Sequence, residues 1–162
     1  MHRVFPLVTE TSKIRGVVGL IKQNGGSIEL SELAEEAEEH IDDLLPLIEA
    51  CKVLGFATVD ESKIRLTELG MTLNIGNTAR IIKEKLVDIE PFYSTLDILK
   101  HGELTTAELL GQLDGRGVSL HGDRETNEAL TKKMLMRLGV RTKLVYYDPA
   151  NDVWSLHPFR KK

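Results

Sequence analysis

The segment Asp42–Gly70 constrains the fold of this chain more than any other part of the sequence. Its first half spaces apolar residues as one face of a helix, and Gly55 then supplies a residue that commonly ends helices. Residues 56–59 and 63–66 follow on either side of a turn at residues 60–62, and apolar and polar side chains alternate along residues 63–66. The segment therefore predicts a helix that runs directly into a two-stranded β hairpin.

Two further helices are predicted before this segment. Apolar residues at helical spacing fill residues 11–23, and the sequence Asn24-Gly25-Gly26 ends that helix. A short alternating stretch at residues 27–30 indicates a strand, and residues 31–40 indicate a second helix with glutamates on its outer face. Three helices closed by a hairpin are the order of elements in a winged helix, a variant of the helix-turn-helix motif.

The second half of the chain repeats this order with longer helices. Helical spacing marks the helices, Thr105 and Glu108 have the spacing of a capping box, and Asp123 is the expected cap of the last helix. Two short strands flank a strong turn signal at residues 148–152. The predicted helices cover residues 79–89, 91–102, 105–113 and 123–138, and the predicted strands cover residues 144–147 and 153–156. We therefore expect a mainly α protein with small β hairpins, built from tandem winged-helix domains at residues 1–74 and 75–162.

The composition favours a globular protein over a membrane-spanning or disulfide-rich one. Of the 162 residues, 41% are apolar and 28% are charged. No apolar run reaches the roughly 18–20 residues that a membrane-spanning helix needs, and the first residues lack the apolar core of a signal peptide. The one cysteine, Cys51, excludes an internal disulfide. These features predict a cytoplasmic protein without membrane insertion.

The charges are distributed unevenly along the chain. Residues 1–76 contain 7 Lys or Arg and 13 Asp or Glu, whereas residues 77–162 contain 14 and 12. The first half is therefore acidic and should repel a phosphate backbone, and the second half should attract one weakly. A charge balance of this kind bears on binding partners and does not bear on the fold.

The sequence contains no pattern typical of a catalytic or cofactor site. It has no GxxxxGK[ST] phosphate-binding loop, which nucleotide hydrolysis of that class requires. The five histidines are scattered without the spacing of metal ligands, and Cys51 lies on the apolar side of a predicted helix, where cysteine acts as a small hydrophobic residue. We therefore expect a protein that is not an enzyme and has no catalytic, cofactor-binding or metal-binding residues.

Three stretches of the sequence carry a family resemblance: DLLPLIEACKVLGFATVDESKIRLTELG at residues 43–70, ARIIKEKLVDIEPF at residues 79–92 and LGVRTKLVYYDPANDVWSL at residues 138–156. They resemble the AAA-associated C-terminal domain family, whose members usually follow the ATP-binding cassette of ABC transporters of the nitrate, sulfonate and bicarbonate type. Leu138-Gly139 departs from the Trp-Gly pair expected there, and residues 115–122 also diverge. The resemblance implies an accessory or regulatory role beside the ATP-binding subunit of such a transporter, and it supplies no catalytic residues.

A protein-interaction surface is predicted on the helix at residues 42–54. Its outward positions carry carboxylates, which makes this helix unsuited to DNA, together with a small apolar strip. The acidic helix with Glu32–Glu39 lies beside it in sequence. The candidate contact residues are Asp43, Pro46, Ala50 and Val53.

The alternative function is a winged-helix transcription regulator that contacts DNA weakly through the second unit. Its predicted last helix presents four basic side chains, Arg124, Lys132, Lys133 and Arg137, and the basic tail Arg160-Lys161-Lys162 follows nearby. Basic residues on one helix could contact phosphates, although a solvated basic surface gives the same pattern. A small-molecule sensor is a third class of function, and the sequence leaves a homodimer open.

Overall fold

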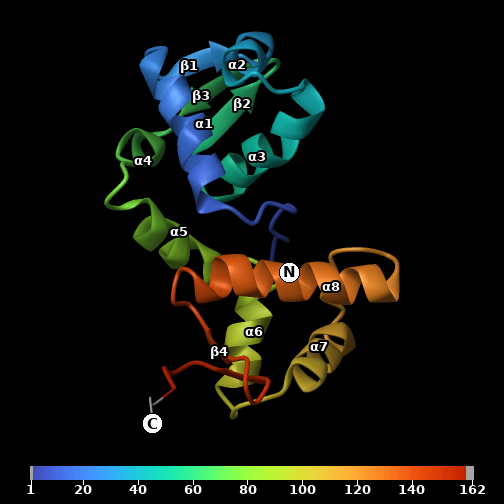
Figure 1. Cartoon of the computed structure of the whole chain (residues 1–162). Coiled ribbons are helices and arrows are strands. Elements are labelled where there is room, and N and C mark those ends of the chain that lie inside the picture. Colours follow the sequence, from blue (N-terminus) through green and yellow to red (C-terminus); the bar gives the residue numbers. More distant parts are fainter. Residues whose placement is uncertain (1, 160–162) are drawn as a thin grey trace. The chain divides into compact units, whose positions relative to one another are not determined.

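The computed structural model describes residues 2–159 of the chain. The fold is mainly helical with two small antiparallel sheets, as the sequence predicts (Figure 1). Its contacts divide the chain into a first unit, Glu10–Ile82, and a second unit made from the described parts of Met1–Thr9 and Lys83–Lys162. This division falls later than the expected boundary after residue 74, and the domain limits themselves stay a prediction.

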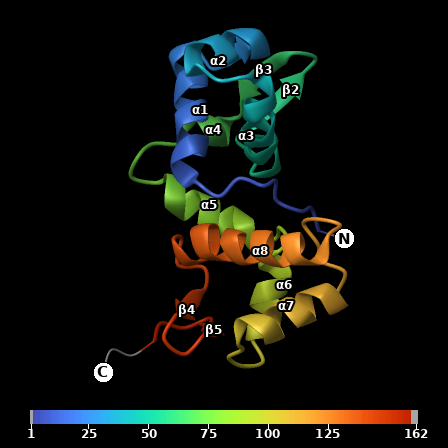
Figure 2. The same cartoon turned by 45° about the vertical axis from the view of Figure 1, so that its right-hand side comes forward.

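The first unit consists of three helices, a three-stranded sheet and a short helical connection (Figure 2). Its sheet is antiparallel with the strand order β1-β3-β2, so that β1 and β2 are the edge strands. The elements are α1 (Thr11–Gln23), β1 (Ser27–Glu29), α2 (Leu30–Ala37), α3 (Ile41–Val53), β2 (Ala57–Asp60), β3 (Lys63–Leu66) and α4 (Glu68–Met71), and α5 (Thr78–Leu86) crosses into the second unit.

The core of the first unit lies between its sheet and its helices. Residues paired across an antiparallel ladder share one face, so Ile28, Ile64 and Val59 lie on the same side of the sheet. Helix α1 packs on β3 and on α3. Its buried residues are the four that the apolar spacing predicts to form the inner stripe: Ile14, Val17, Val18 and Ile21.

The base of the β2–β3 hairpin is held by a group of backbone and hydroxyl hydrogen bonds. Thr67 donates its backbone N–H to the carbonyl of Phe56 and its hydroxyl to the carbonyl of Gly55, at 3.0 and 2.6 Å. The same hydroxyl accepts the backbone N–H of Gly70, which caps α4. The stretch at residues 43–70, one of the three that carry the family resemblance, therefore includes the residues that close the hairpin, which gives them a structural role.

The second unit follows the same order of elements. Its helices are α6 (Phe92–Leu99), α7 (Thr106–Gly115) and α8 (Arg124–Met134), and its strands are β4 (Tyr146–Asp148) and β5 (Val153–Ser155). An isolated bridge from Leu104 to Trp154 places a third chain segment beside β5, as β1 lies beside β3 in the first unit. The helix predicted at residues 123–138 continues instead as a π-helix, η1 (Leu135–Val140).

A hydrogen-bond network joins the β4–β5 hairpin to the start of α7. The Trp154 indole N–H donates to the Thr106 hydroxyl at 2.8 Å, and that hydroxyl donates to the Asp152 carboxylate. The Tyr147 hydroxyl donates to the same carboxylate at 2.8 Å. These hydrogen bonds from Thr106 and Tyr147 lower the pKa of Asp152. The neighbouring Thr105 forms the capping box of α7, which the sequence predicts.

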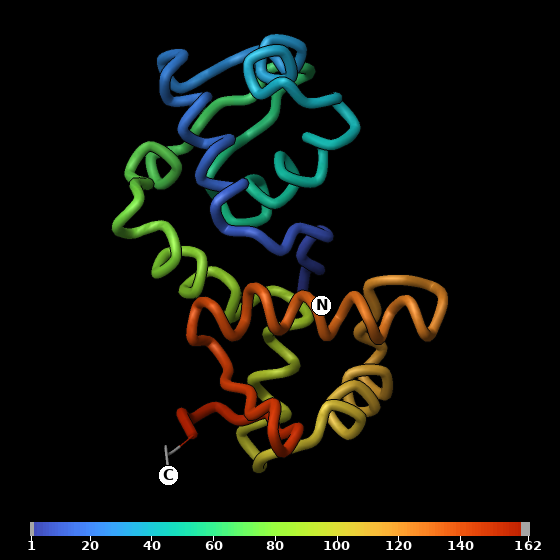
Figure 3. The backbone as a smooth tube through the Cα atoms, viewed as in Figure 1, coloured from blue at the N-terminus to red at the C-terminus, as the bar shows by residue number. Residues whose placement is uncertain are grey.

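The N-terminal segment belongs to the second unit by its contacts, which the sequence does not indicate (Figure 3). The backbone N–H of Phe5 donates to the carbonyl of Glu90, and the N–H of Glu90 donates to the carbonyl of Arg3, both at 2.8 Å. The Phe5 ring is buried and meets Phe92 edge-on, with 6.5 Å between ring centroids. The chain therefore starts in the second unit, passes through the whole first unit and returns.

Candidate protein-interaction surface

The exposed face of α3 is centred on Leu45. With about 3.6 residues per turn, Ile41, Leu45, Glu49 and Lys52 fall on one side of this helix, and all four are exposed. Leu44, Ile48 and Cys51 are buried on the adjoining side of the helix. Ile41 and Leu45 are 41% and 47% exposed, which leaves two large apolar side chains open to solvent on neighbouring turns.

This face differs from the one predicted on the same helix. Asp43 and Pro46 are exposed as expected, whereas Val53 is only half-buried and Ala50 is 0% exposed. The placement of Ala50 on the outer surface is therefore wrong. Helix α3 packs against α1, α2 and β2, so its buried arc is wider than the single stripe that the sequence pattern indicates. The apolar strip of Pro46, Ala50 and Val53 does not exist as a surface.

A different apolar strip forms where α3 lies against β2. The chain turns back at Gly55, and Val59 lies about 13 Å further along the strand. Leu45 lies about 13 Å before the end of α3, so Leu45 and Val59 are similarly far from this turn, on two elements that pack against each other. Val59 is 38% exposed although its strand partner Ile64 is buried. We name the set Ile41, Leu45 and Val59 the apolar strip.

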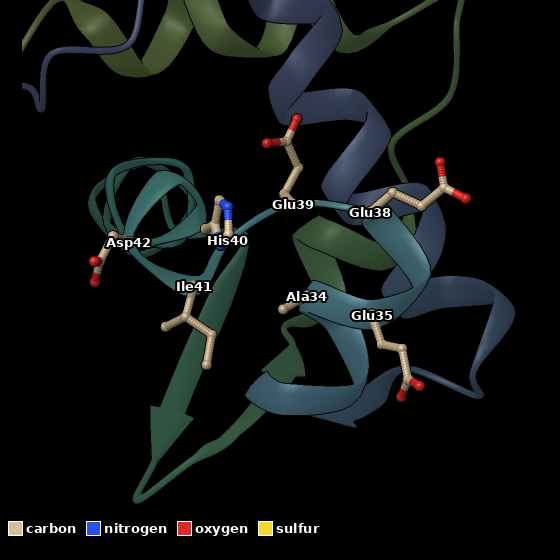
Figure 4. Close-up of a pocket in the computed structure, with 7 residues that line it drawn as sticks. All are labelled: Ala34, Glu35, Glu38, Glu39, His40, Ile41 and Asp42. Carbon is tan, nitrogen blue, oxygen red and sulfur yellow. The ribbon is translucent and has the colours of Figure 1, made fainter.

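An open groove of about 620 Å³ borders this strip at the connection between α2 and α3. Helix α2 ends at Ala37, and the capping residue Glu38 adopts a left-handed backbone with φ 55° that lets the chain turn into α3. The residues that line the groove are Ala34, Glu35, Glu38, Glu39, His40, Ile41 and Asp42 (Figure 4). We name it the α2–α3 groove.

The carboxylates of the α2–α3 groove point away from one another. In Figure 4 the side chains of Glu35, Glu38, Glu39 and Asp42 leave the backbone in four different directions. A cation site would need oxygens converging on one point, and within residues 2–159 no group of His, Cys, Asp or Glu side chains could hold a metal ion. The groove can therefore supply a diffuse negative potential around the apolar Ile41 side chain.

The basic side chains of the second unit do not form one cluster. Lys132, Lys133 and Arg137 are exposed near the junction of α8 and η1. Arg124 lies about 12 Å from Lys132 along the helix axis, and its Nε is 3.4 Å from Glu128 Oε1. The structure thus brings three of the four predicted residues into one region and leaves Arg124 at the other end. The basic tail at residues 160–162 lies outside the described residues.

Two chemically reactive groups have surroundings that limit their use. Cys51 is buried, and this burial raises the pKa of its thiol to about 12, so the nucleophilic thiolate is scarce at neutral pH. Asp123 caps α8 by accepting from Thr126, and these hydrogen bonds hold the pKa of the carboxyl below its usual value.

No helix in the described part of the chain is long and apolar enough to cross a membrane.

Comparison with known proteins gives one match. A family model described as the C-terminal AAA-associated domain matches residues 31–148, which run from α2 to the end of β4. The matched range includes the apolar strip and the whole α2–α3 groove. Searches of curated proteins and of solved structures found no match.

Proposed function

Since this chain belongs to the family of C-terminal AAA-associated domains, we propose that it is a non-catalytic accessory module that regulates an ABC-type transporter ATPase. Membership associates the chain with AAA or ABC ATPases. The finer proposal names the ATP-binding subunit of a nitrate, sulfonate or bicarbonate transporter as the partner and the cytoplasm as the location. The observation that carries it is the family match over residues 31–148.

The proposal includes winged-helix units as the binding scaffold. In the first unit, α1, β1, α2, α3, β2 and β3 follow one another in the winged-helix order, with a sheet ordered β1-β3-β2. The second unit has the same order, with a single bridge at Leu104 in place of the first strand. In such modules the third helix is often the one that contacts a partner, and α3 carries two exposed apolar side chains.

The apolar strip and its acidic surroundings support protein binding over DNA binding by the first unit. Exposed apolar side chains rimmed by charge are typical of protein interfaces, and phosphates would be repelled by Asp42 and Asp43 at the start of α3.

The expected catalytic inactivity is part of the proposal. Purified chain should neither hydrolyse ATP nor bind it tightly, and saturable hydrolysis that survives further purification would contradict this.

Affinity capture with the tagged chain tests the proposed partner. We expect mass spectrometry of the captured proteins to identify an ATP-binding transporter subunit, which is then purified and titrated directly. Leu45→Arg should weaken the complex about tenfold or more, because it places a charge in the centre of the interface. Glu103→Arg, an exposed change in the second unit, is the matched control and should not do so. Failure of any transporter subunit to bind would refute the proposed function.

DNA binding by the second unit is the alternative function, favoured by the exposure of Lys132, Lys133 and Arg137 near one end of α8. If it holds, the double change Lys132→Glu and Lys133→Glu should abolish binding of genomic fragments at low salt. Each lost phosphate contact should also lower the slope of log K against log salt by about one. Fluorescence anisotropy over a salt series measures both effects. Arg124→Glu should matter less, because Arg124 is remote and paired with Glu128.

A further inference from the structure

Strand β2 is an edge strand whose outer side faces no other strand of the sheet. In an antiparallel ladder, the N–H and C=O of one residue point to the same side of the strand, and successive residues alternate sides. Two hydrogen bonds establish toward which neighbouring strand each residue of the hairpin directs its backbone N–H and C=O groups. The N–H of Leu66 donates to Gly26 and the carbonyl of Ser62 accepts from Leu30, both at 2.8 Å.

These two bonds show that the even-numbered residues Ser62, Ile64 and Leu66 direct their backbone N–H and C=O groups toward β1. The odd-numbered residues Lys63 and Arg65 therefore direct their backbone groups toward β2, where their partners are Asp60 and Thr58. The bond from the Thr67 N–H to the Phe56 carbonyl continues the same alternation. The backbone N–H and C=O of Val59 consequently point away from β3, toward the open edge of the sheet.

The side-chain surroundings of this open edge define what fits there. Val59 lies on the helix-facing side of the sheet, on the strand that packs against α3, and α3 carries the exposed apolar residues Leu45 and Ile41. Residues 58–60 are all exposed, so no part of the first unit covers the edge at Val59. A strand added beside β2 would place every second side chain on the apolar strip, and the others on the side that carries Thr58 and Asp60.

The charge at this end of the unit is negative. Asp42 and Asp43 lie in the first turn of α3, Asp60 ends β2 and Glu61 lies in the hairpin turn, and all four are exposed. Lys63 lies opposite Asp60 in the ladder and offsets one of these carboxylates. An incoming segment with lysine or arginine between its apolar residues would meet complementary charge. A second copy of β2 would not supply this complementary charge, because the strand Ala57–Asp60 carries no basic side chain.

We propose that β2 accepts an extended segment of a partner protein as a fourth strand, giving the order β1-β3-β2-partner. The segment alternates apolar side chains, which pack on Ile41, Leu45 and Val59, with basic side chains. The inference deepens the proposed function and rests on it for the identity of the partner as a transporter ATPase subunit. Backbone pairing supplies affinity in this binding mode, and the alternate side chains supply specificity.

Amide hydrogen exchange followed by NMR tests the pairing residue by residue. The probe is a peptide of about seven residues that alternates lysine and valine, with blocked ends. In the free chain, the amides of Thr58 and Asp60 should exchange slowly, and the amide of Val59 should exchange fast. Saturating peptide should slow the exchange of Val59 about tenfold or more, whereas an alternating glutamate–valine peptide should not.

Two changes at one position separate backbone pairing from side-chain contact. Val59→Pro removes the outward N–H without removing a bond to β3, because proline is tolerated at such edge positions. It should weaken peptide binding about tenfold. Val59→Thr keeps the N–H and should bind within about threefold of the parent. Thermal unfolding checks that both variants are folded. Equal binding by both variants would overturn the inference, as would peptide protection confined to α2 and α3.

The outcomes separate this inference from the proposed function. Capture of a transporter subunit without protection of Val59 in the complex would support the proposed function and refute strand addition. Protection of Val59 by the peptide, with no transporter subunit captured, would support strand addition and refute the proposed partner. Protection of Val59 that rises with protein concentration in the absence of peptide would indicate a second copy as the occupant and contradict the proposal.

Discussion

Replacing Gly70 with alanine is expected to destabilise the first unit by about 3 kcal/mol. A Cβ atom on Gly70 would collide with the backbone carbonyl oxygen of Phe56, and it would also press on the Cβ of Leu66 at 3.4 Å. The Phe56 carbonyl is fixed because it accepts the N–H of Thr67 at the base of the hairpin. The clash therefore cannot be relieved by rotating a side chain, and the hairpin or α4 must move.

Gly16 offers a matched control within the same unit. It lies inside α1 on the exposed side, and a Cβ built on it meets nothing within 4 Å. Gly16→Ala should stabilise the unit by about 0.5–1 kcal/mol, because alanine loses less backbone entropy in a helix. Denaturant unfolding of both variants measures the difference. Equal stability of the two alanine variants would contradict the packing described at Gly70.

The second large effect is expected from Phe5→Ala, which should destabilise the second unit by about 3–5 kcal/mol. The Phe5 ring is buried against Phe92, and its neighbouring backbone is paired with Glu90. Removal of the ring leaves a cavity in a core to which, among the described residues 2–9, only Val8 contributes a further buried apolar side chain. Loss of this anchor should also release the backbone pairing of residues 3–5.

Hydrogen exchange resolved by residue measures this effect, because it separates the two units. Amides of α6 and η1 should lose protection in Phe5→Ala, whereas amides of α1 and β3 should keep theirs. The neighbouring change Leu7→Ala is the control, since Leu7 is half exposed and exposed substitutions typically change stability by less than about 0.5 kcal/mol. Loss of protection in both units, or in neither, would contradict the assignment of the N-terminal segment to the second unit.

Local patterns in the sequence predict those parts of the fold that depend on local physics. The inner stripe of α1, the alternation of β3, the capping box at Thr105 and the cap at Asp123 each depend on residues close together in sequence. The structure confirms them because helix periodicity and capping act within a few residues. Turn residues at 60–62 and 148–152 are likewise local signals, and the hairpins form where those signals stand.

The errors and omissions arise where distant segments decide the outcome. Ala50 is buried because three elements surround α3, whereas a single apolar stripe predicts contact on one side. The pairing of Val4 with Glu90 leaves no local signal in either segment. The apolar strip takes residues from both α3 and β2. The apolar spacing within α3 therefore could not predict that Val59 belongs to it, because this also depends on the hairpin register and on how α3 packs on β2. The π-helical turn at residues 135–140 carries apolar spacing that also fits an α-helix.

The route of the chain has a consequence for its folding during synthesis. The first unit is complete by residue 82 and can fold while the ribosome is still making the second. Val4 and Phe5, by contrast, must wait for Glu90 and Phe92, an interval of roughly 4–17 seconds at about 5–20 residues per second. During that time Val4 and Phe5 have no partner within their own unit. These residues are therefore made before the first unit, yet they can pair only after it, when Glu90 and Phe92 have been made.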